Sequence, residues 1–338
     1  MQPLESGAAP IEWDVTSFLA LERSESGEEI VLKICATTRA MRVKWAACAV
    51  AALVLCAPHS TAARPAAAEN DAAESPGVAV IPPAGMLDAG FRELYVLNFQ
   101  GARAQFLSYQ KAQPQDPLGK AAEAASYLFE QFNAKGVFTS AFFLDDAKFL
   151  GGVDGKPSEN RNDAFLDANR RARDMARQWL RSNPRDAHGL LALTLADGME
   201  ADYTALIEKR QLASLSLIRQ AESEAKDLLA VDPSAQDAYV ALGAGNYIVG
   251  CLPAYKRAFV WFGGVHGDRA RGIQQIQLAA DHGHYLQPYA RILLALALER
   301  EHQTDRARAI FSGLVSEFPS NPLYAHELGL LNRGAGKP

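Results

Sequence analysis

The sequence contains few cysteines and few of the patterns that mark β-strands. Only four of its 338 residues are cysteine, and three of these precede residue 60. Val, Ile and Thr rarely alternate with polar residues, so strands are poorly supported. Ala and Leu are abundant, and the apolar share of 49% and charged share of 22% are those of a globular chain. We therefore expect an all-α fold.

Catalytic signatures are also lacking. The sequence has no Gly-x-Ser-x-Gly elbow, no Gly-Lys-Ser/Thr phosphate loop and no dinucleotide glycine fingerprint. The stretch "DGMEADY" supplies Asp197, Glu200 and Asp202. Asp197 and Glu200 are i,i+3 neighbours on a helix. We expect both side chains to lie on a solvated helix face; the alternative is that they form a catalytic pair. We predict a protein that is not an enzyme and uses no cofactor.

A metal site has little support. In "DHGHYLQP", His282 and His284 lie near Asp281. Two histidines two residues apart do not share a helix face, and no further ligand set has the spacing that metals need. We expect these residues to form a turn and to bind no metal.

A basic excess is missing as well. The formal net charge is −5, and no long block of like charge occurs. A surface that binds a polyanion needs a surplus of Lys and Arg. The composition therefore predicts no nucleic-acid partner.

Residues 41–63 have the features of a secretory signal peptide. Arg42 and Lys44 give a positive start, residues 46–57 form an apolar run, and small residues precede Arg64. The run has about a dozen residues, whereas a membrane span needs about 20. We predict cleavage before Arg64, export to the periplasm or cell envelope, and no stable membrane span in the mature chain.

The flanking segments follow from this prediction. Residues 1–40 are acid-rich and show no sustained pattern. They are either a misassigned upstream extension, with Met41 as the true start, or a disordered cytoplasmic segment. Residues 64–84 are rich in Ala and Pro and predict a flexible linker. Residues 85–338 then form the folded domain.

Cleavage before Arg64 would also remove three of the four cysteines. It leaves Cys251 as the single cysteine, so an intramolecular disulfide is excluded and core burial stabilises the fold. We expect Cys251 to be a buried apolar residue. Cys56 raises the alternative of a lipoprotein, which is disfavoured because Leu55 stands where lipoprotein signals have a small residue.

One spacing recurs four times between residues 102 and 319. A small residue is followed by apolar residues at +4 and +7 and by proline at +12. The copies are Ala102, Phe106, Tyr109 and Pro114; Ala172, Ala176, Trp179 and Pro184; Ala221, Ala225, Leu228 and Pro233; and Ala307, Phe311, Leu314 and Pro319. Offsets 0, 4 and 7 lie on one helix face, and proline cannot continue a helix. The pattern predicts a cycle of helix, proline-containing turn and helix.

This cycle resembles the tetratricopeptide (TPR) repeat. "YVALG" at residues 239–243 and "HELG" at 326–329 are similar to its first helix, and "ARAIF" at 307–311 with Pro319 is similar to its second. The resemblance covers most of residues 87–335. It implies an all-α, TPR-like right-handed helical solenoid of about six helix pairs, which binds a protein or extended peptide on its concave face.

The spacing of the repeats departs from the family. Successive matched prolines lie 70, 49 and 86 residues apart, against a TPR period of about 34. We expect two units in the first interval and two in the third. The middle interval needs one longer unit, with an extended helix over residues 200–232. Residues 137–160 fit no second helix of a TPR pair.

The candidate partner site is the aromatic-rich segment before residue 263. Four apolar residues at 259–262 cannot all face one side of a helix, so some pack on the neighbouring repeat and one or two line a groove. Tyr, Trp and Arg are common anchors at protein contacts. The predicted contact residues are Tyr247, Tyr255, Lys256, Arg257, Trp261 and Phe262. For this aromatic patch, packing between repeats is the expectation and a ligand or partner groove is the alternative.

The sequence thus predicts a non-catalytic protein- or peptide-binding scaffold of the bacterial cell envelope. A helical carrier of a small molecule or lipid, associated with transport, is the alternative. It requires a closed apolar cavity near Trp261. An enzyme would require acidic or histidine side chains that converge in such a cavity.

Overall fold

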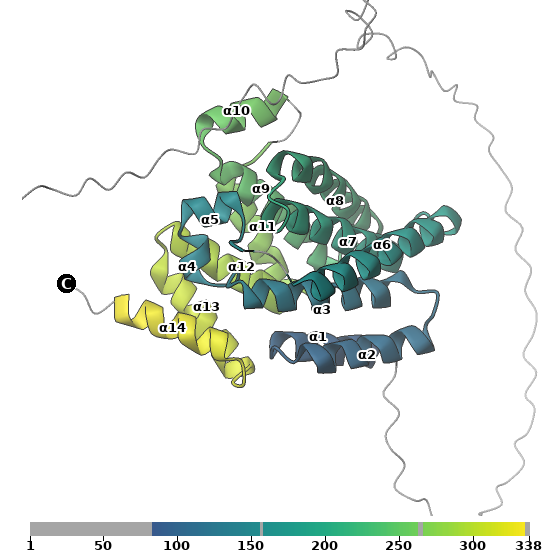
Figure 1. The fold of residues 1–338 in the computed structure, drawn as a ribbon. Coiled ribbons are helices and arrows are strands. Elements are labelled where there is room, and N and C mark those ends of the chain that lie inside the picture. The colour runs from purple at the N-terminus through teal and green to yellow at the C-terminus, as the bar shows by residue number, and fades with distance from the viewer. Residues whose placement is uncertain (1–82, 156–157, 263–265, 335–338) are drawn as a thin grey trace, which may run out of the picture. The chain divides into compact units, whose positions relative to one another are not determined.

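The computed structural model describes residues 83–155, 158–262 and 266–334, and the regular structure of these residues is entirely helical (Figure 1). Residues 1–40, the predicted signal at 41–63 and the linker up to residue 82 lie outside the described residues. Within the described ranges, no helix is both long enough and apolar enough to cross a membrane. The first described helix begins at Pro83.

The described helices pack as five hairpins followed by one further helix, where the sequence predicted about six pairs. The hairpins are α1 (Pro83–Tyr95) with α2 (Phe99–Ala112), α3 (Pro117–Ala134) with α6 (Glu159–Ser182), α7 (Ala187–Leu206) with α8 (Gln211–Val231), α9 (Tyr239–Cys251) with α11 (Arg269–His282), and α12 (Gln287–Arg300) with α13 (Thr304–Glu317). The last helix is α14 (Pro322–Gly334). Shorter elements are α4 (Ser140–Phe143), α5 (Asp146–Gly151), η2 (Gln236–Ala238) and α10 (Ala254–Phe262).

The recurring spacing marks the second helix of four hairpins, as predicted. In α2, α6, α8 and α13 the residue at offset 0 is buried against the first helix of the pair, and the proline follows two residues after the helix ends. A fifth copy lies in α11, where Gly272, Ile276 and Ala279 are buried at offsets 0, 4 and 7. His284 takes the place of the proline. This fifth copy divides the 86-residue interval between Pro233 and Pro319 into two units, as predicted.

The 70-residue interval holds one unit and not two. Residues 137–158 form an insertion between α3 and α6 that contains α4 and α5. The predicted extended helix over residues 200–232 is also wrong, because the chain breaks between Leu206 and Gln211. Lys209 adopts a positive φ of 57° there, a backbone conformation that ends helices.

The hairpins form an inner and an outer layer. The first helices α3, α7, α9 and α12 bury residues around their whole circumference; residues 294–298 of α12, for example, are each at most 1% exposed. The second helices bury one face only. A helix that is apolar all round belongs in an interior. The first helices therefore form the core, and the second helices cover it.

Contacts between the N-terminal and C-terminal hairpins close this core. The Tyr95 hydroxyl of α1 donates to the carbonyl of Tyr285 at 2.8 Å, and the Asn321 side-chain amide donates to the Tyr95 carbonyl at 2.8 Å. Phe91 stacks on Tyr285 with ring centroids 5.0 Å apart, and Phe318 packs on Tyr95. In Figure 1, α1, α2 and α14 accordingly lie along one edge of the molecule.

The α4–α5 insertion seals a second side. Arg300 of α12 donates to the Phe143 carbonyl at 2.5 Å, pairs with Asp146 and lies 4.7 Å above the Phe149 ring. The backbone N–H of Ser140 donates to the buried Glu327 carboxylate of α14 at 3.1 Å. The insertion therefore packs on both α12 and α14.

Close contact between α9 and α11 depends on glycine. A Cβ added at Gly272 would lie 2.6 Å from the Tyr247 backbone nitrogen, and one at Gly243 would lie 2.7 Å from the Ile276 backbone nitrogen. Asp268 caps α11 as predicted, since its side chain accepts from the N–H of Arg271 at 3.0 Å. The two helices cross with their backbones in contact.

Candidate functional site

The predicted partner residues divide between the surface and the core. Helix α10 lies on the surface, where Tyr255 is 71% exposed and Trp261 is 55% exposed (Figure 1). Val260 is the buried residue between them and packs on Val249 of α9. The side chain of Phe262 lies outside the described part of the chain. Helix α10 therefore presents two large aromatic side chains to solvent.

Tyr247 does not share this surface. It is 2% exposed, its ring packs on Phe149, and its hydroxyl donates to the carbonyl of Ala297 at 3.3 Å and to Glu301 at 3.2 Å. Burial, with the Glu301 charge contributing, raises the pKa of the Tyr247 hydroxyl. The side chain fixes α9 to α12 and lies away from the surface of α10.

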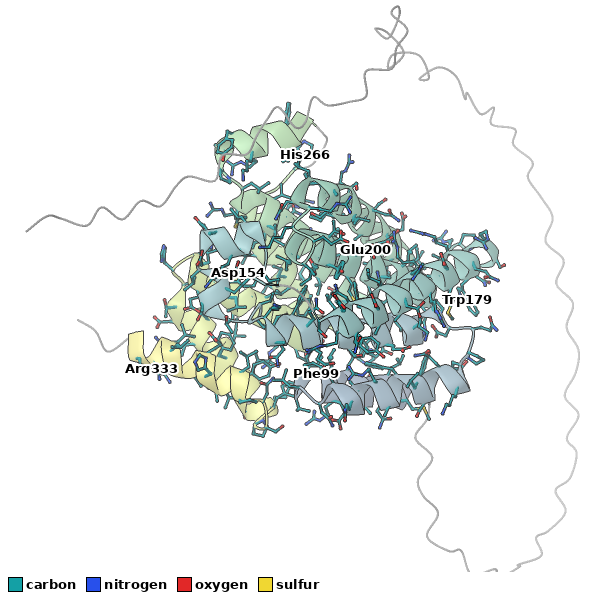
Figure 2. The ribbon with its side chains drawn as sticks, viewed as in Figure 1. Phe99, Asp154, Trp179, Glu200, His266 and Arg333 are labelled. Atoms are coloured by element: carbon teal, nitrogen blue, oxygen red, sulfur yellow. The ribbon has the colours of Figure 1, made fainter. Side chains whose placement is uncertain are left out.

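The charge of α10 is positive. Its nine residues include Lys256 and Arg257 and no carboxylate. Arg257 is exposed and donates to the Gly250 carbonyl at 3.3 Å, and Lys256 is half-buried. His266 lies beside Trp261, with ring centroids 6.0 Å apart, and Figure 2 labels it next to α10.

Helix α8 extends the apolar surface next to α10. Leu215 packs against the pair formed by Val249 and Val260, and Leu212, one turn earlier on α8, is 51% exposed. Large apolar side chains with this exposure are few among the described residues. We call the exposed side chains of Tyr255, Arg257 and Trp261 on α10, together with Leu212 of α8, the α10 surface.

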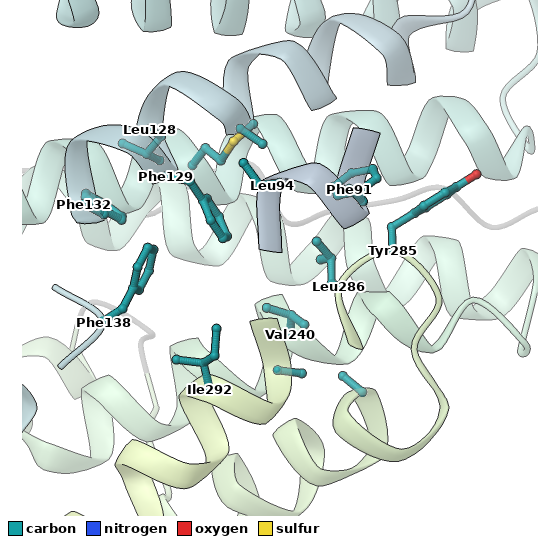
Figure 3. Close-up of a cluster of buried hydrophobic side chains, with 14 of the residues drawn as sticks. Phe91, Leu94, Leu128, Phe129, Phe132, Phe138, Val240, Tyr285, Leu286 and Ile292 are labelled. Carbon is teal, nitrogen blue, oxygen red and sulfur yellow. The ribbon is translucent and has the colours of Figure 1, made fainter. Parts of the chain in front are cut away.

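A cavity of about 100 Å³ lies inside the ring of first helices. Its wall is made of apolar side chains from α1, α3, α7, α8, α9 and α12. Figure 3 shows the part of the wall where Phe129 and Phe132 of α3 face residues of the later hairpins. Trp261 does not border the cavity, so the apolar space required for a carrier lies elsewhere than predicted.

Four polar side chains border this cavity. Thr194 and Asp202 come from α7, Asp237 from η2 and Tyr289 from α12. The carboxylate of Asp237 accepts from three backbone N–H groups, those of residues 284–286, at 2.8 to 3.1 Å. Asp237 therefore holds the loop that leads into α12. Its role is structural.

Asp202 has no such partners. No hydrogen bond or ion pair links its carboxyl group to the described residues, and desolvation raises its pKa to about 7. Asp202 is half-buried and borders the cavity. The charge of Asp202, after burial, also raises the pKa of Tyr289. The two groups therefore lie near each other on the wall.

A second acidic cluster lies between α6, α7 and α8. Asp197 is fully buried, pairs with Arg173 and accepts from Gln220 at 2.6 Å. The solvated face predicted for Asp197 is therefore wrong. Burial and the Asp197 charge raise the pKa of Glu224 to about 8. Glu224 therefore holds a proton near neutral pH, and its protonated carboxyl group donates a hydrogen bond to Asp197. This cluster joins three helices and does not line the cavity described above.

The remaining predicted groups occupy structural positions. Cys251 is buried, as predicted, and burial raises the pKa of its thiol. His284 pairs with Asp88 of α1 at 2.8 Å and stacks on Tyr285. Within the described ranges, no group of three His, Cys, Asp or Glu side chains is placed to hold a metal ion.

Comparison with known proteins finds little. No family model matches the chain, and no curated protein matches it. Among solved structures, the chain is similar to a thermophilic TPR protein from Thermus thermophilus, with a TM-score of 0.40 and 16% sequence identity. The match covers 74% of this chain and 98% of that one.

The class of the protein follows from its own helices. Five consecutive hairpins, whose second helices carry one shared spacing, define an all-α helical-repeat protein of TPR-like architecture. Its inner helices enclose a core that contains the cavity lined by α1, α3, α7, α8, α9 and α12.

Proposed function

We propose that this chain is a non-catalytic binding scaffold of the bacterial cell envelope, which docks a protein partner on the α10 surface. The observation that carries the proposal is the exposure of Tyr255 and Trp261 on one short helix. Aromatic side chains at this level of exposure are typical anchors of protein interfaces.

The partner's chemistry follows from the surface. Helix α10 carries cationic residues and no carboxylate, beside aromatic side chains and the exposed Leu212. A complementary segment would place apolar side chains between carboxylates, because opposite charges at the rim steer association and apolar burial supplies affinity. The proposed partner is therefore an acidic, apolar protein segment.

Site-specific photo-crosslinking in the producing cells tests this proposal. A benzophenone amino acid replaces Trp261 or Tyr255 in turn, and a third chain carries it at Leu107, which is 44% exposed on α2. We expect one discrete protein adduct from both α10 positions and none from position 107. Arg257→Glu should reduce the adduct, because it reverses the charge at the rim. The same adduct from position 107, or none from α10, would refute docking on this surface.

The envelope location has its own test. Export predicts a mature N-terminus at Arg64 and recovery of the chain in the periplasmic or envelope fraction. N-terminal sequencing of the protein from fractionated cells measures both. A chain that begins before residue 41 and remains in the cytoplasm would contradict the proposed location.

A carrier of small molecules is a second candidate, favoured by the internal cavity. That cavity is apolar, and it borders a carboxyl group without a partner. Ligand sites usually combine an apolar wall with a small number of such polar groups.

A further inference from the structure

The polar groups on the wall of the internal cavity are unequally satisfied. Asp237 is held by backbone N–H groups, but Asp202 has no hydrogen bond or ion pair with the described residues. The hydroxyl of Thr194, further along the same face of α7, also has no hydrogen-bond partner. The Asp202 carboxyl group on the cavity wall is therefore available to pair with a ligand bound there.

The charge of that ligand follows from the wall. The cavity is lined by no lysine, arginine or histidine, so nothing on the wall compensates an ionised Asp202. Burial consequently favours the protonated acid and raises its pKa to about 7. A bound cation would supply the missing charge and return Asp202 to its ionised form.

The shape of the cavity sets the rest of the ligand. Gly198 lies one turn before Asp202 on α7, and a Cβ built there would meet no atom within 4 Å. Space therefore continues along α7 from the carboxyl group, between apolar side chains of α3 and α9. A volume of about 100 Å³ accommodates several non-hydrogen atoms, because about 10–15 Å³ of such space is enough for one water.

We propose that this cavity binds a small alkylammonium ion, whose ammonium group pairs with Asp202 and whose hydrocarbon chain lies beside Gly198. This site is separate from the α10 surface and goes beyond the scaffold function. It gives the carrier candidate a ligand class. The hydroxyl of Tyr289, near Asp202, is available as a second acceptor for the ammonium N–H groups.

Binding should depend on pH in a defined direction. Pairing requires ionised Asp202, so affinity for an alkylammonium ion should rise as pH increases from 6 to 8, through the pKa of about 7. The other titratable groups on the wall are Asp237 of η2 and Tyr289 of α12, while α1, α3, α8 and α9 contribute apolar residues and glycine. Neither group gains a positive charge in this range.

Isothermal titration calorimetry on the full-length chain tests the proposal, with n-butylammonium as the probe and n-butanol as its neutral counterpart. We expect n-butylammonium to bind at least about tenfold more tightly, because a desolvated charge pair adds to the same apolar contact. Asp202→Asn should remove this preference and leave n-butanol within about twofold of its original affinity. Asp305→Asn, at a side chain that is 95% exposed, is the matched control and should change neither.

Gly198→Leu provides an independent test, because it fills the cavity and keeps the carboxyl group. We expect it to abolish binding of both probes while circular dichroism shows a folded helical chain. Equal affinity for the two probes, unchanged ammonium binding in Asp202→Asn, or no binding to the unmodified chain would overturn the proposal. If Asp202→Asn does not fold, Gly198→Leu and the pH dependence decide the outcome. Crosslinking from Trp261 is expected to persist in Gly198→Leu, so failure of one site is distinguishable from failure of the other.

Discussion

The same substitution should have opposite effects at two glycines of the inner layer. Gly198 lies in the interior of α7, and an added Cβ meets no atom within 4 Å. Gly243 lies in α9, and an added Cβ would be 2.7 Å from the Ile276 backbone nitrogen and 2.9 Å from the Gly272 carbonyl oxygen. The obstacle at Gly243 is backbone, which cannot rotate away.

The magnitudes follow from these surroundings. Gly198→Ala gains helix propensity without steric cost, so the free energy of unfolding should rise by about 0.5–1 kcal/mol. This corresponds to an increase in Tm of about 1–4 °C for a domain of this size. Gly243→Ala gains the same propensity but forces α9 and α11 apart, so the free energy of unfolding should fall by about 1–3 kcal/mol.

Urea denaturation followed by helical circular dichroism measures both values. The paired design removes helix propensity from the comparison, because both substitutions add one methyl group to an inner helix. Stabilisation by Gly243→Ala would refute the backbone contact between α9 and α11. Destabilisation by Gly198→Ala would refute the open space beside α7, and with it the cavity on which the ligand proposal rests.

Three further predictions concern closure and titration. Tyr95→Phe removes a buried hydrogen bond to the Tyr285 carbonyl and should lower the free energy of unfolding by about 1–2 kcal/mol, measured in urea; no change would mean that this contact does not close the ring. Asp237→Ala leaves three backbone N–H groups without an acceptor and should cost about 2–4 kcal/mol, with faster hydrogen exchange at residues 284–286; unchanged exchange would contradict its anchoring role. Glu224 has a folded-state pKa of about 8, above its unfolded value, so the folded state holds the extra proton and stability falls as pH rises from about 4.5 to 8. Glu224→Gln should flatten this decline, which is at most about 1.4 kcal/mol per pH unit for one group, and an unchanged profile would place the titration elsewhere.

The sequence contained enough information to predict the outer layer. Offsets of 0, 4 and 7 identify a single buried face, and this face is confirmed in α2, α6, α8 and α13. The copy in α11 does not match the full pattern, because Gly272 replaces the alanine at offset 0 and His284 replaces the proline at offset 12. A pattern that allows any small residue at offset 0 and does not require proline at offset 12 includes this copy.

Closure could not be predicted from local patterns. The amide of Asn321 reaches the Tyr95 carbonyl across 226 positions of the chain, and neither residue carries a periodic signal. The cavity was hidden for a similar reason. Asp202 has the sequence context of an ordinary polar residue on an amphipathic helix, and only the approach of α9 and α12 places it in an interior.

The α10 surface was partly predictable. The sequence located the aromatic and cationic residues correctly along the chain, and Tyr255 and Trp261 are exposed. It could not separate them from Tyr247, because apolar residues before a glycine-rich turn fit either a core or a surface position. The position of Tyr247 depends on its contacts with α12, which lies 40 to 50 residues later in the chain.

The meeting of the first and last hairpins has a consequence for how the chain acquires its structure. An open array of repeats can fold from any unit outward, because each unit contacts only its neighbours. Here Tyr95 finds its partners only after residues 285 and 321 have been synthesised, so the first hairpin emerges with its inner face uncovered. Contacts over such separations slow folding and make it cooperative. A chain that ends before Tyr285 should therefore lose more than its last helices: it leaves the first hairpin exposed to proteases and to association with other unfinished chains.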